Sequence, residues 1–201
     1  VLSFLATLVC NKTVLDCGCG TGKYVRLLAP FCKTYYAVDV AGDALERAAS
    51  KAASNVQVIS ARAEALPLAD HSVDVVFGTW VLGTISDTAR RKLAIESCLR
   101  VLRPGGAMYL VENDIGGEFE YVRGRYPDIS LTIEYNEWLQ SECGFEVLQR
   151  FETHFAFSDL ADARDTFREI WGNCAAKRVA HPDLRHRVIV FEIAKSTHSI
   201  T

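Results

Sequence analysis

Two acidic residues and a glycine-rich segment are the residues of this sequence best suited to bind a small ligand. The segment Asp16–Gly22 (DCGCGTG) follows a short apolar run, and Asp39 ends the next apolar run along the chain. Glycines at such a position allow a sharp turn and a close approach of the backbone to a ligand. Nucleotide-type ligands bind where the carboxyl ends of parallel strands meet. The pattern therefore predicts a nucleotide-type ligand between the two acids.

The spacing of the glycines decides between two kinds of nucleotide ligand. A dinucleotide fingerprint, Gly-x-Gly-x-x-Gly, requires its third glycine where this chain has Lys23. The chain has Gly-x-Gly-x-Gly instead, after Asp16, whose charge repels a pyrophosphate but attracts an ammonium and a sulfonium. Asp39 can accept hydrogen bonds from both hydroxyls of a ribose. These features favour S-adenosylmethionine.

With two further segments, the sequence resembles the class I S-adenosylmethionine-dependent methyltransferases of the small methyltransferase-domain type. The segments are Glu64–Pro67 (EALP) and Leu102–Gly106 (LRPGG), and the resemblance covers roughly residues 13–115. It implies an α/β, Rossmann-like fold with a doubly wound mixed sheet of seven strands, in the order 3-2-1-4-5-7-6 with the last strand antiparallel. It also implies methyl transfer from S-adenosylmethionine, with S-adenosylhomocysteine as the product.

The resemblance assigns cofactor contacts position by position. The glycine loop is expected to hold the methionine portion with Asp16 near its ammonium, while Asp39 binds the ribose and Val40 packs on the adenine. Backbone N–H groups of Ala63 and Glu64 are expected at the adenine edge, and the residues after the fourth strand beside the methionine. The expected cofactor-binding residues are Asp16, Gly18, Cys19, Gly20, Gly22, Asp39, Val40, Ala63, Glu64, Gly78, Thr79 and Trp80.

The sequence departs from the family pattern in three places. Relatives often have Asp or Asn where this chain has Arg62, which cannot accept a hydrogen bond from the adenine amino group. Many relatives carry a histidine after the fourth strand, where residues 82–85 contain none. Few residues precede the first strand, so the cofactor lid is expected to be shortened, supplied by residues 115–132, or carried by residues before Val1.

Methyl transfer from a sulfonium is an in-line displacement in which the donor is already activated. The enzyme must align a nucleophile and exclude water, and it needs a general base only for a protonated acceptor. Side chains at the ends of the fourth and fifth strands are expected to face the methyl group. The candidate catalytic residues are therefore Trp80, Glu112 and Asn113, with Asp114 beside them. No metal site is predicted.

Three functions stay open for the acceptor side. The first is methyl transfer to a nucleophilic N, O or C atom of a small molecule. Residues 80–87 and Asn113-Asp114 also resemble the protein N-terminal α-amine methyltransferases, in which an Asn helps hold the amine; Thr84 replaces their histidine. That resemblance implies a protein or peptide N-methyltransferase. The third is a cofactor-binding fold without methyl transfer, such as one that uses a decarboxylated cofactor as an aminopropyl donor.

Alternating strand and helix patterns are expected to position these residues. Short apolar runs predict strands at 13–16, 34–39, 56–60, 73–78, 107–111, 145–157 and 187–194. Helical patterns are expected at 23–28, 41–52, 86–102, 134–143 and 158–172, with Ser86 and Ser158 as N-caps and Gly172 as the end of the last helix. Residues 115–132 are interpreted as a surface excursion. Residues 178–187 are interpreted as a solvated basic connector, with a site for an anionic acceptor as the alternative.

Length and composition fit a single domain over residues 1–201, with a cofactor-binding core at 13–114 and acceptor-side segments at 115–132 and 158–186. The 22 basic and 25 acidic residues give a net charge of −3, so no excess of positive charge favours nucleic acid or a membrane surface. Without a membrane span or signal pattern in the first ten residues, a cytoplasmic protein is expected. The 7 cysteines are expected to be reduced and mostly buried.

Overall fold

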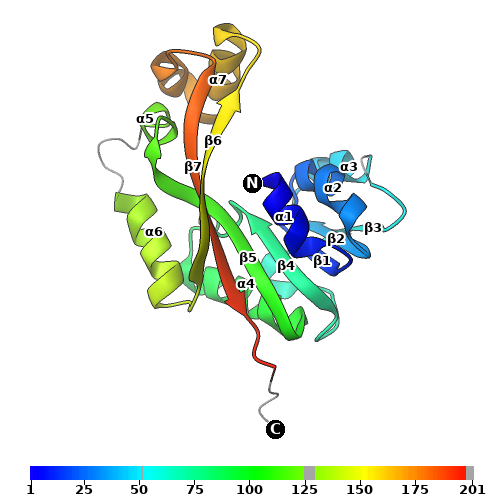
Figure 1. The fold of residues 1–201 in the computed structure, drawn as a ribbon. Coiled ribbons are helices and arrows are strands. Elements are labelled where there is room, and N and C mark those ends of the chain that lie inside the picture. Colours follow the sequence, from blue (N-terminus) through cyan, green and yellow to red (C-terminus); the bar gives the residue numbers. More distant parts are fainter. Residues whose placement is uncertain (51, 125–129, 198–201) are drawn as a thin grey trace. The chain divides into compact units, whose positions relative to one another are not determined.

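A computed structural model describes residues 1–50, 52–124 and 130–197, which form an α/β fold around a seven-stranded sheet (Figure 1). The strand order, β3-β2-β1-β4-β5-β7-β6, confirms the predicted topology. The strands are β1 (Thr13–Cys17), β2 (Thr34–Asp39), β3 (Val56–Ser60), β4 (Val73–Thr79), β5 (Leu102–Gly117), β6 (Glu146–Ala156) and β7 (Asp183–Ala194). The α-helices are α1 (Leu2–Val9), α2 (Lys23–Leu28), α3 (Gly42–Ala49), α4 (Thr88–Val101), α5 (Phe119–Val122), α6 (Ser130–Ser141) and α7 (Leu160–Arg178). Short 3-10 helices are η1 (Ala29–Phe31), η2 (Ala63–Ala65) and η3 (Leu82–Thr84).

The chain divides into two compact units. The first comprises Val1–Val111 and Phe191–Thr201, and the second comprises Glu112–Val190. Strands β5 and β7 each contribute residues to both units. None of the helices in the described ranges combines the length and the apolar character that a membrane crossing requires.

The first unit is built on parallel strands, with β1 paired to β2 on one side and to β4 on the other. Every residue of β1 is buried, as expected for a central strand covered on both faces. Helix α3 packs on β2 and β3, and α1 packs on α2. Because the strands are parallel, Cys17, Asp39 and Thr79 end their strands at the same edge of the sheet. This edge positions the candidate cofactor residues.

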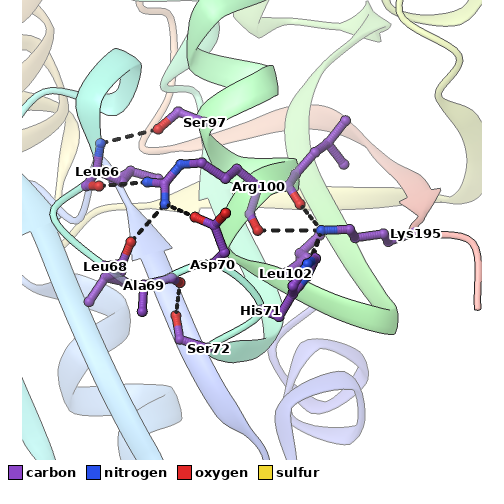
Figure 2. Close-up of polar contacts among 11 residues, drawn as sticks. Leu66, Leu68, Ala69, Asp70, His71, Ser72, Ser97, Arg100, Leu102 and Lys195 are labelled. Carbon is purple, nitrogen blue, oxygen red and sulfur yellow. Dashed lines mark hydrogen bonds and ion pairs between the residues drawn. The ribbon is translucent and has the colours of Figure 1, made fainter. Parts of the chain in front are cut away.

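The C-terminal end of α4 is tied to the segment that follows β7 (Figure 2). The last carbonyl groups of a helix have no partner within the helix. Lys195 Nζ donates to three carbonyl oxygens there, those of Leu99 and Leu102 at 2.7 Å and that of Arg100 at 3.3 Å. A cation at this end also complements the helix dipole. Lys195 therefore caps α4 from a distant part of the sequence.

Arg100, in the last turn of α4, holds the segment that leads into β4 (Figure 2). Its guanidinium donates to the carbonyl oxygens of Leu66 at 2.7 Å and Leu68 at 2.8 Å. It also forms an ion pair with Asp70 at 2.6 Å. Ser97, one turn earlier, accepts a hydrogen bond from the Leu66 N–H at 3.1 Å. These contacts fix the connection between η2 and β4.

The predicted N-cap of α4 is wrong by one residue. Asp87, and not Ser86, is the N-cap, because its Oδ1 accepts a hydrogen bond from the Arg90 N–H at 2.9 Å. A carboxylate at this position also interacts favourably with the helix dipole. Helix α3 is shorter than predicted, and α1 was not predicted; its Leu5 and Val9 are buried in the first unit.

Strand β5 is longer at both ends than predicted. Pro104-Gly105-Gly106 lies before the expected strand at 107–111, but the observed strand includes these residues. The Gly105 N–H donates to Lys195 O at 3.0 Å, and the Lys195 N–H donates to Gly106 O at 2.8 Å. These residues extend the strand because the segment after β7 pairs with their backbone N–H and C=O groups, which would otherwise need partners in a local turn.

The second unit contradicts the interpretation of 115–132 as a surface excursion. Strand β5 continues to Gly117, α5 follows, and α6 begins at Ser130; residues 125–129, with Pro127, lie outside the described residues. Gly117 has a φ of +76°, and a Cβ atom there would lie 2.8 Å from Arg185 O. Gly117 therefore allows β5 and β7 to approach closely.

Strand β7 runs antiparallel to β5, as predicted. Hydrogen bonds join Gly105 to Lys195 within the first unit and Glu118 to Arg185 within the second, so the two strands run in opposite directions. However, β7 begins at Asp183, four residues earlier than expected. His186 is 3% exposed, so the expectation of a solvated connector is wrong at this residue.

Helix α7 also differs from its predicted boundaries. Asp159 caps it, because its Oδ1 accepts from the N–H groups of Ala161 at 2.8 Å and Asp162 at 2.9 Å. Ser158 was the expected cap, but its N–H and hydroxyl both bond to Asp162. Gly172, at a φ of +82°, kinks the helix, which then continues to Arg178.

The cysteines also differ in part from expectation. Cys17, Cys19 and Cys98 are buried free thiols. Cys10 and Cys174 are exposed, so the expectation of mostly buried thiols is wrong for these two. Burial raises the pKa of Cys19 to about 12, which keeps it protonated beside the glycine turn.

Candidate cofactor site

The three glycines after β1 have different structural roles. All have positive φ angles, 78° at Gly18, 52° at Gly20 and 75° at Gly22, a region that favours glycine. A Cβ atom on Gly18 would overlap Val81, and one on Gly22 would lie 2.7 Å from the Cα atom of Ala48 in α3. A Cβ atom on Gly20 would meet no atom within 4 Å. Gly20 is therefore the glycine at which the backbone borders open space.

Asp39 is held against this glycine loop. Its Oδ2 accepts a hydrogen bond from the Gly20 N–H at 2.8 Å. Its Oδ1 accepts from the N–H groups of Val40 at 2.7 Å and Ala41 at 3.0 Å. Each carboxylate oxygen has about two acceptor sites, so Oδ1 is fully used and Oδ2 can still accept one hydroxyl donor. A second ribose hydroxyl would have to share Oδ1 with the backbone N–H groups. The neighbouring Val40 is an apolar side chain with 61% exposure, which suits an aromatic base that would cover it.

Asp16 is completely buried at the end of β1. The Tyr35 hydroxyl donates to its Oδ2 at 2.7 Å, whereas Oδ1 has no hydrogen-bond partner among the residues described. Burial raises the pKa of Asp16 to about 7; the Tyr35 hydrogen bond acts in the opposite direction, and the negative charge of Asp39 adds to the increase. A buried acid with one unsatisfied oxygen fits a site for a cationic ligand.

Arg62 is accommodated through the side chain of Glu64. Glu64 Oε1 accepts from Arg90 Nε at 2.8 Å and Nη2 at 2.5 Å, and it lies 3.6 Å from Arg62 Nη2. Both arginines therefore pair with one carboxylate. Arg62 is the N-cap residue of η2, and Ala63 and Glu64 begin it, so the backbone N–H groups expected at the adenine edge lie at the start of this short helix.

The chain leaves β4 through a sharp turn at Trp80. Trp80 has a φ of +52°, an uncommon conformation for a residue other than glycine, and its N–H donates to Val111 O at 2.9 Å. A Cβ atom on Gly78 would lie 2.9 Å from Val81 Cγ1. Val81 thus fills the space beside both Gly18 and Gly78. The sequence did not predict this role of Val81, because no pattern among neighbouring residues shows which glycines pack against a side chain.

The remaining candidate residues form a polar cluster in the second unit. Glu112 is 3% exposed and accepts a hydrogen bond from the Tyr135 hydroxyl at 2.9 Å. Asn113 Oδ1 lies 2.9 Å from His186 Nε2, and the Asn113 carbonyl accepts from Asn136 Nδ2 at 3.1 Å. Glu112 and Asn113 were expected just past β5, but they lie within it. Tyr135, Asn136 and His186 carried no spacing signal in the sequence.

The imidazole of His186 is enclosed by aromatic rings. The Phe119 ring centroid lies 4.5 Å away, and that of Phe155 lies 4.8 Å away in a stacked arrangement. Asp114, the next residue of β5, forms an ion pair with Arg150 at 3.1 Å. The polar side chains of β5 in the second unit are thus held by fixed partners on α6, β6 and β7.

Comparison with known proteins identifies similar sequences and folds. Residues 15–110 match a family described as a methyltransferase domain. A tRNA (carboxymethyluridine(34)-5-O)-methyltransferase of Arabidopsis thaliana is 35% identical over 106 residues, covering 53% of this chain and 25% of that protein. A malonyl-(acyl-carrier protein) O-methyltransferase of Methylococcus capsulatus is 38% identical over 99 residues, covering 47% and 35%. The chain thus spans only a minor part of these relatives.

The fold is similar over almost the whole chain to a solved structure. The YcgJ protein of Bacillus subtilis superposes with a TM-score of 0.69, covering 97% of each chain, at 20% sequence identity. At this identity the likeness concerns the fold alone. It includes the second unit, which the family match does not reach.

Proposed function

Residues 15–110 belong to the methyltransferase domain family, and from this premise we propose that the protein transfers a methyl group to a small-molecule acceptor. The cofactor of this family is S-adenosylmethionine, which supplies an activated methyl group when it is bound. The acceptor atom that we propose is a nucleophilic N, O or C atom. The main support is the 2.8 Å hydrogen bond from the Gly20 N–H to Asp39, because it makes the glycine loop and the ribose-binding acid one site.

The residues of the first unit would bind and orient the cofactor. Asp39 would accept the ribose hydroxyls, and Val40 would lose its solvent exposure against the adenine. Gly20 would allow the methionine portion to approach the backbone, since no atom occupies the space beside it. Asp16 would supply negative charge near the positive end of the ligand. Together these contacts would fix the direction of the methyl group, which is the main requirement for an in-line displacement.

Trp80, Glu112 and Asn113 remain our proposed catalytic residues. Glu112 and Asn113 are suited to orienting an acceptor, because Tyr135 and His186 hold their side chains in one position. Such fixed polar groups lower the entropic cost of alignment. The backbone strain at Trp80 is of the kind often found at functional sites.

Two measurements test this proposal. Isothermal titration calorimetry with S-adenosylmethionine and S-adenosylhomocysteine should show binding of both, and no binding of either would contradict it. Release of S-adenosylhomocysteine should then be followed with fractionated metabolites and, separately, with peptide arrays. Turnover with metabolites supports the small-molecule acceptor, whereas turnover with peptides alone would replace it by a protein acceptor.

A further inference from the structure

Tyr35 and Asp16 form a buried pair that the family resemblance does not explain. Tyr35 lies on β2 opposite Val14 of β1, two residues before Asp16. Its hydroxyl reaches Asp16 Oδ2 at 2.7 Å, and neither side chain is exposed. Burial is the main cause that raises the pKa of Tyr35 well above its usual value, so the phenol keeps its proton and acts as the donor. The second carboxyl oxygen, Oδ1, has no hydrogen-bond partner in the described part of the chain.

Among the residues that the structure describes, no positive charge acts on Asp16. Asp39 is negative, and Tyr24 of α2, Cys17 and Cys19 are neutral groups whose pKa values are raised. Asp16 forms no ion pair with any residue that the structure describes. A buried charge without a partner is costly, so the carboxyl retains a proton up to about neutral pH, where its pKa lies.

The ligands of the proposed site differ in the charge that they would bring to this pair. Both ligands carry the ammonium of the amino-acid portion; S-adenosylmethionine carries a sulfonium in addition, whereas S-adenosylhomocysteine has a neutral sulfur. Asp16 directly precedes the glycine loop that would bind them. A positive charge nearby favours the ionised form of a carboxyl group, and the effect is larger in a buried, weakly screened site.

We propose that the Tyr35–Asp16 pair senses the charge of the bound cofactor. Binding of the sulfonium form displaces the proton from Asp16 to the solvent, and Tyr35 is the positioning residue that holds the resulting carboxylate. The neutral-sulfur product stabilises the carboxylate less, so Asp16 takes up a proton again and the affinity for the product is lower. The inference rests on the proposed function, because it requires a sulfonium ligand at the glycine loop.

Calorimetry in pairs of buffers with different ionisation enthalpies tests this inference on the intact chain. Near pH 7, binding of S-adenosylmethionine should release about half a proton more from the native protein than from the Asp16→Asn variant. Titration of the ligand itself cancels in this comparison. S-adenosylhomocysteine should release fewer protons from Asp16. The affinity for S-adenosylmethionine should rise with pH through about pH 7 and then level off.

The Tyr35→Phe variant tests the positioning role. Loss of the hydroxyl removes the hydrogen bond that lowers the pKa of Asp16, so the rise in affinity should move to higher pH. The affinity for S-adenosylmethionine near pH 7 should fall about tenfold. At pH 8 this variant should release more protons than the native protein does. Tyr36→Phe is the matched control, since Tyr36 is the next residue of the same strand, and it should behave as the native protein.

The outcomes separate this inference from the proposed function. Absence of binding by either ligand to the native protein would remove both. Binding with the same proton release in the native protein, Asp16→Asn and Tyr35→Phe would overturn the charge-sensing role and leave the proposed function intact. Should Tyr35→Phe fail to fold, the comparison of the native protein with Asp16→Asn still decides, because equal proton release in those two contradicts the inference.

Discussion

At the scale of single residues, the three glycines of the loop illustrate what the sequence could and could not predict. Their number and spacing predicted a tight turn, and Asp16 and Asp39 were identified beside it. The sequence could not show that Gly18 and Gly22 serve packing whereas Gly20 borders open space. That distinction depends on Val81 and on Ala48 of α3, which are distant in sequence and become neighbours only in the fold.

Gly18→Ala should mainly lower the stability of the fold, whereas Gly20→Ala should mainly weaken ligand binding. Both substitutions place a Cβ atom in a left-handed conformation, which costs about 1–2 kcal/mol. Gly18→Ala should lower the free energy of unfolding by a further 1–3 kcal/mol or so, because the added atom overlaps Val81. Gly20→Ala should retain more stability but weaken S-adenosylhomocysteine binding. Urea unfolding and calorimetry measure the two effects, and equal destabilisation of both variants would contradict these roles.

Asp16 should make the stability of the free protein depend on pH. Its pKa is about 7 in the folded protein and near 3.8 when unfolded, so the folded state binds the extra proton between these values. Its stabilising contribution is therefore complete below about pH 4 and is lost as the pH rises through about 7. Between pH 5 and pH 8 the loss should be about 2–3 kcal/mol. Urea unfolding should show a weaker pH dependence for Asp16→Asn, and equal slopes would refute the assignment.

At the scale of elements, continuous apolar runs predicted strands well, whereas caps and glycine-containing ends were predicted poorly. Strand β2 (Thr34–Asp39) and strand β3 (Val56–Ser60) match their expected ranges because each is a short run that determines its own boundaries. Strand β5 does not match its expected range, because glycines such as Gly105 and Gly117 are typical of turns. In the fold, Gly105 bonds to Lys195 just after β7, and Gly117 lies against Arg185 of β7. The residues that neighbour these glycines in the sequence do not indicate a partner so far along the chain.

The N-cap of α4 offers a matched pair of neighbouring variants. Asp87→Ala should lower the free energy of unfolding by about 1 kcal/mol, because the Arg90 N–H loses its acceptor. Ser86→Ala should change it by less than about 0.5 kcal/mol, since Ser86 is not the cap. Thermal or urea unfolding of the two variants distinguishes the positions. The reverse order of effects would support the cap expected from the sequence.

Lys195 should contribute to stability although it lies near the end of the described chain. Lys195→Met removes the donor to the carbonyl oxygens of Leu99 and Leu102, and we expect a loss of about 1–2 kcal/mol in the free energy of unfolding. Lys177→Met, at an exposed position of α7, is the control and should have little effect. An equal loss of unfolding free energy in both variants would mean that removing any lysine charge has this effect, and it would contradict the capping role of Lys195.

At the scale of the whole molecule, the match to a methyltransferase domain was predictable because the motifs that carry the resemblance lie in residues 13–115, and that resemblance also implied the strand order. The second unit, Glu112–Val190, was not predicted in comparable detail. Its polar cluster joins β5 to α6 and β7 through side chains such as Tyr135 and His186, and no motif spacing connects these segments.

The most direct measurement is calorimetric titration of S-adenosylhomocysteine into the native protein and the Asp39→Ala variant, with Asp43→Ala of α3 as the control. We predict that Asp39→Ala weakens binding at least tenfold, because the ribose loses a charged acceptor, and that Asp43→Ala binds as the native protein does. Circular dichroism would show that both variants are folded. Unchanged affinity in folded Asp39→Ala would contradict a nucleoside bound between this acid and the glycine loop.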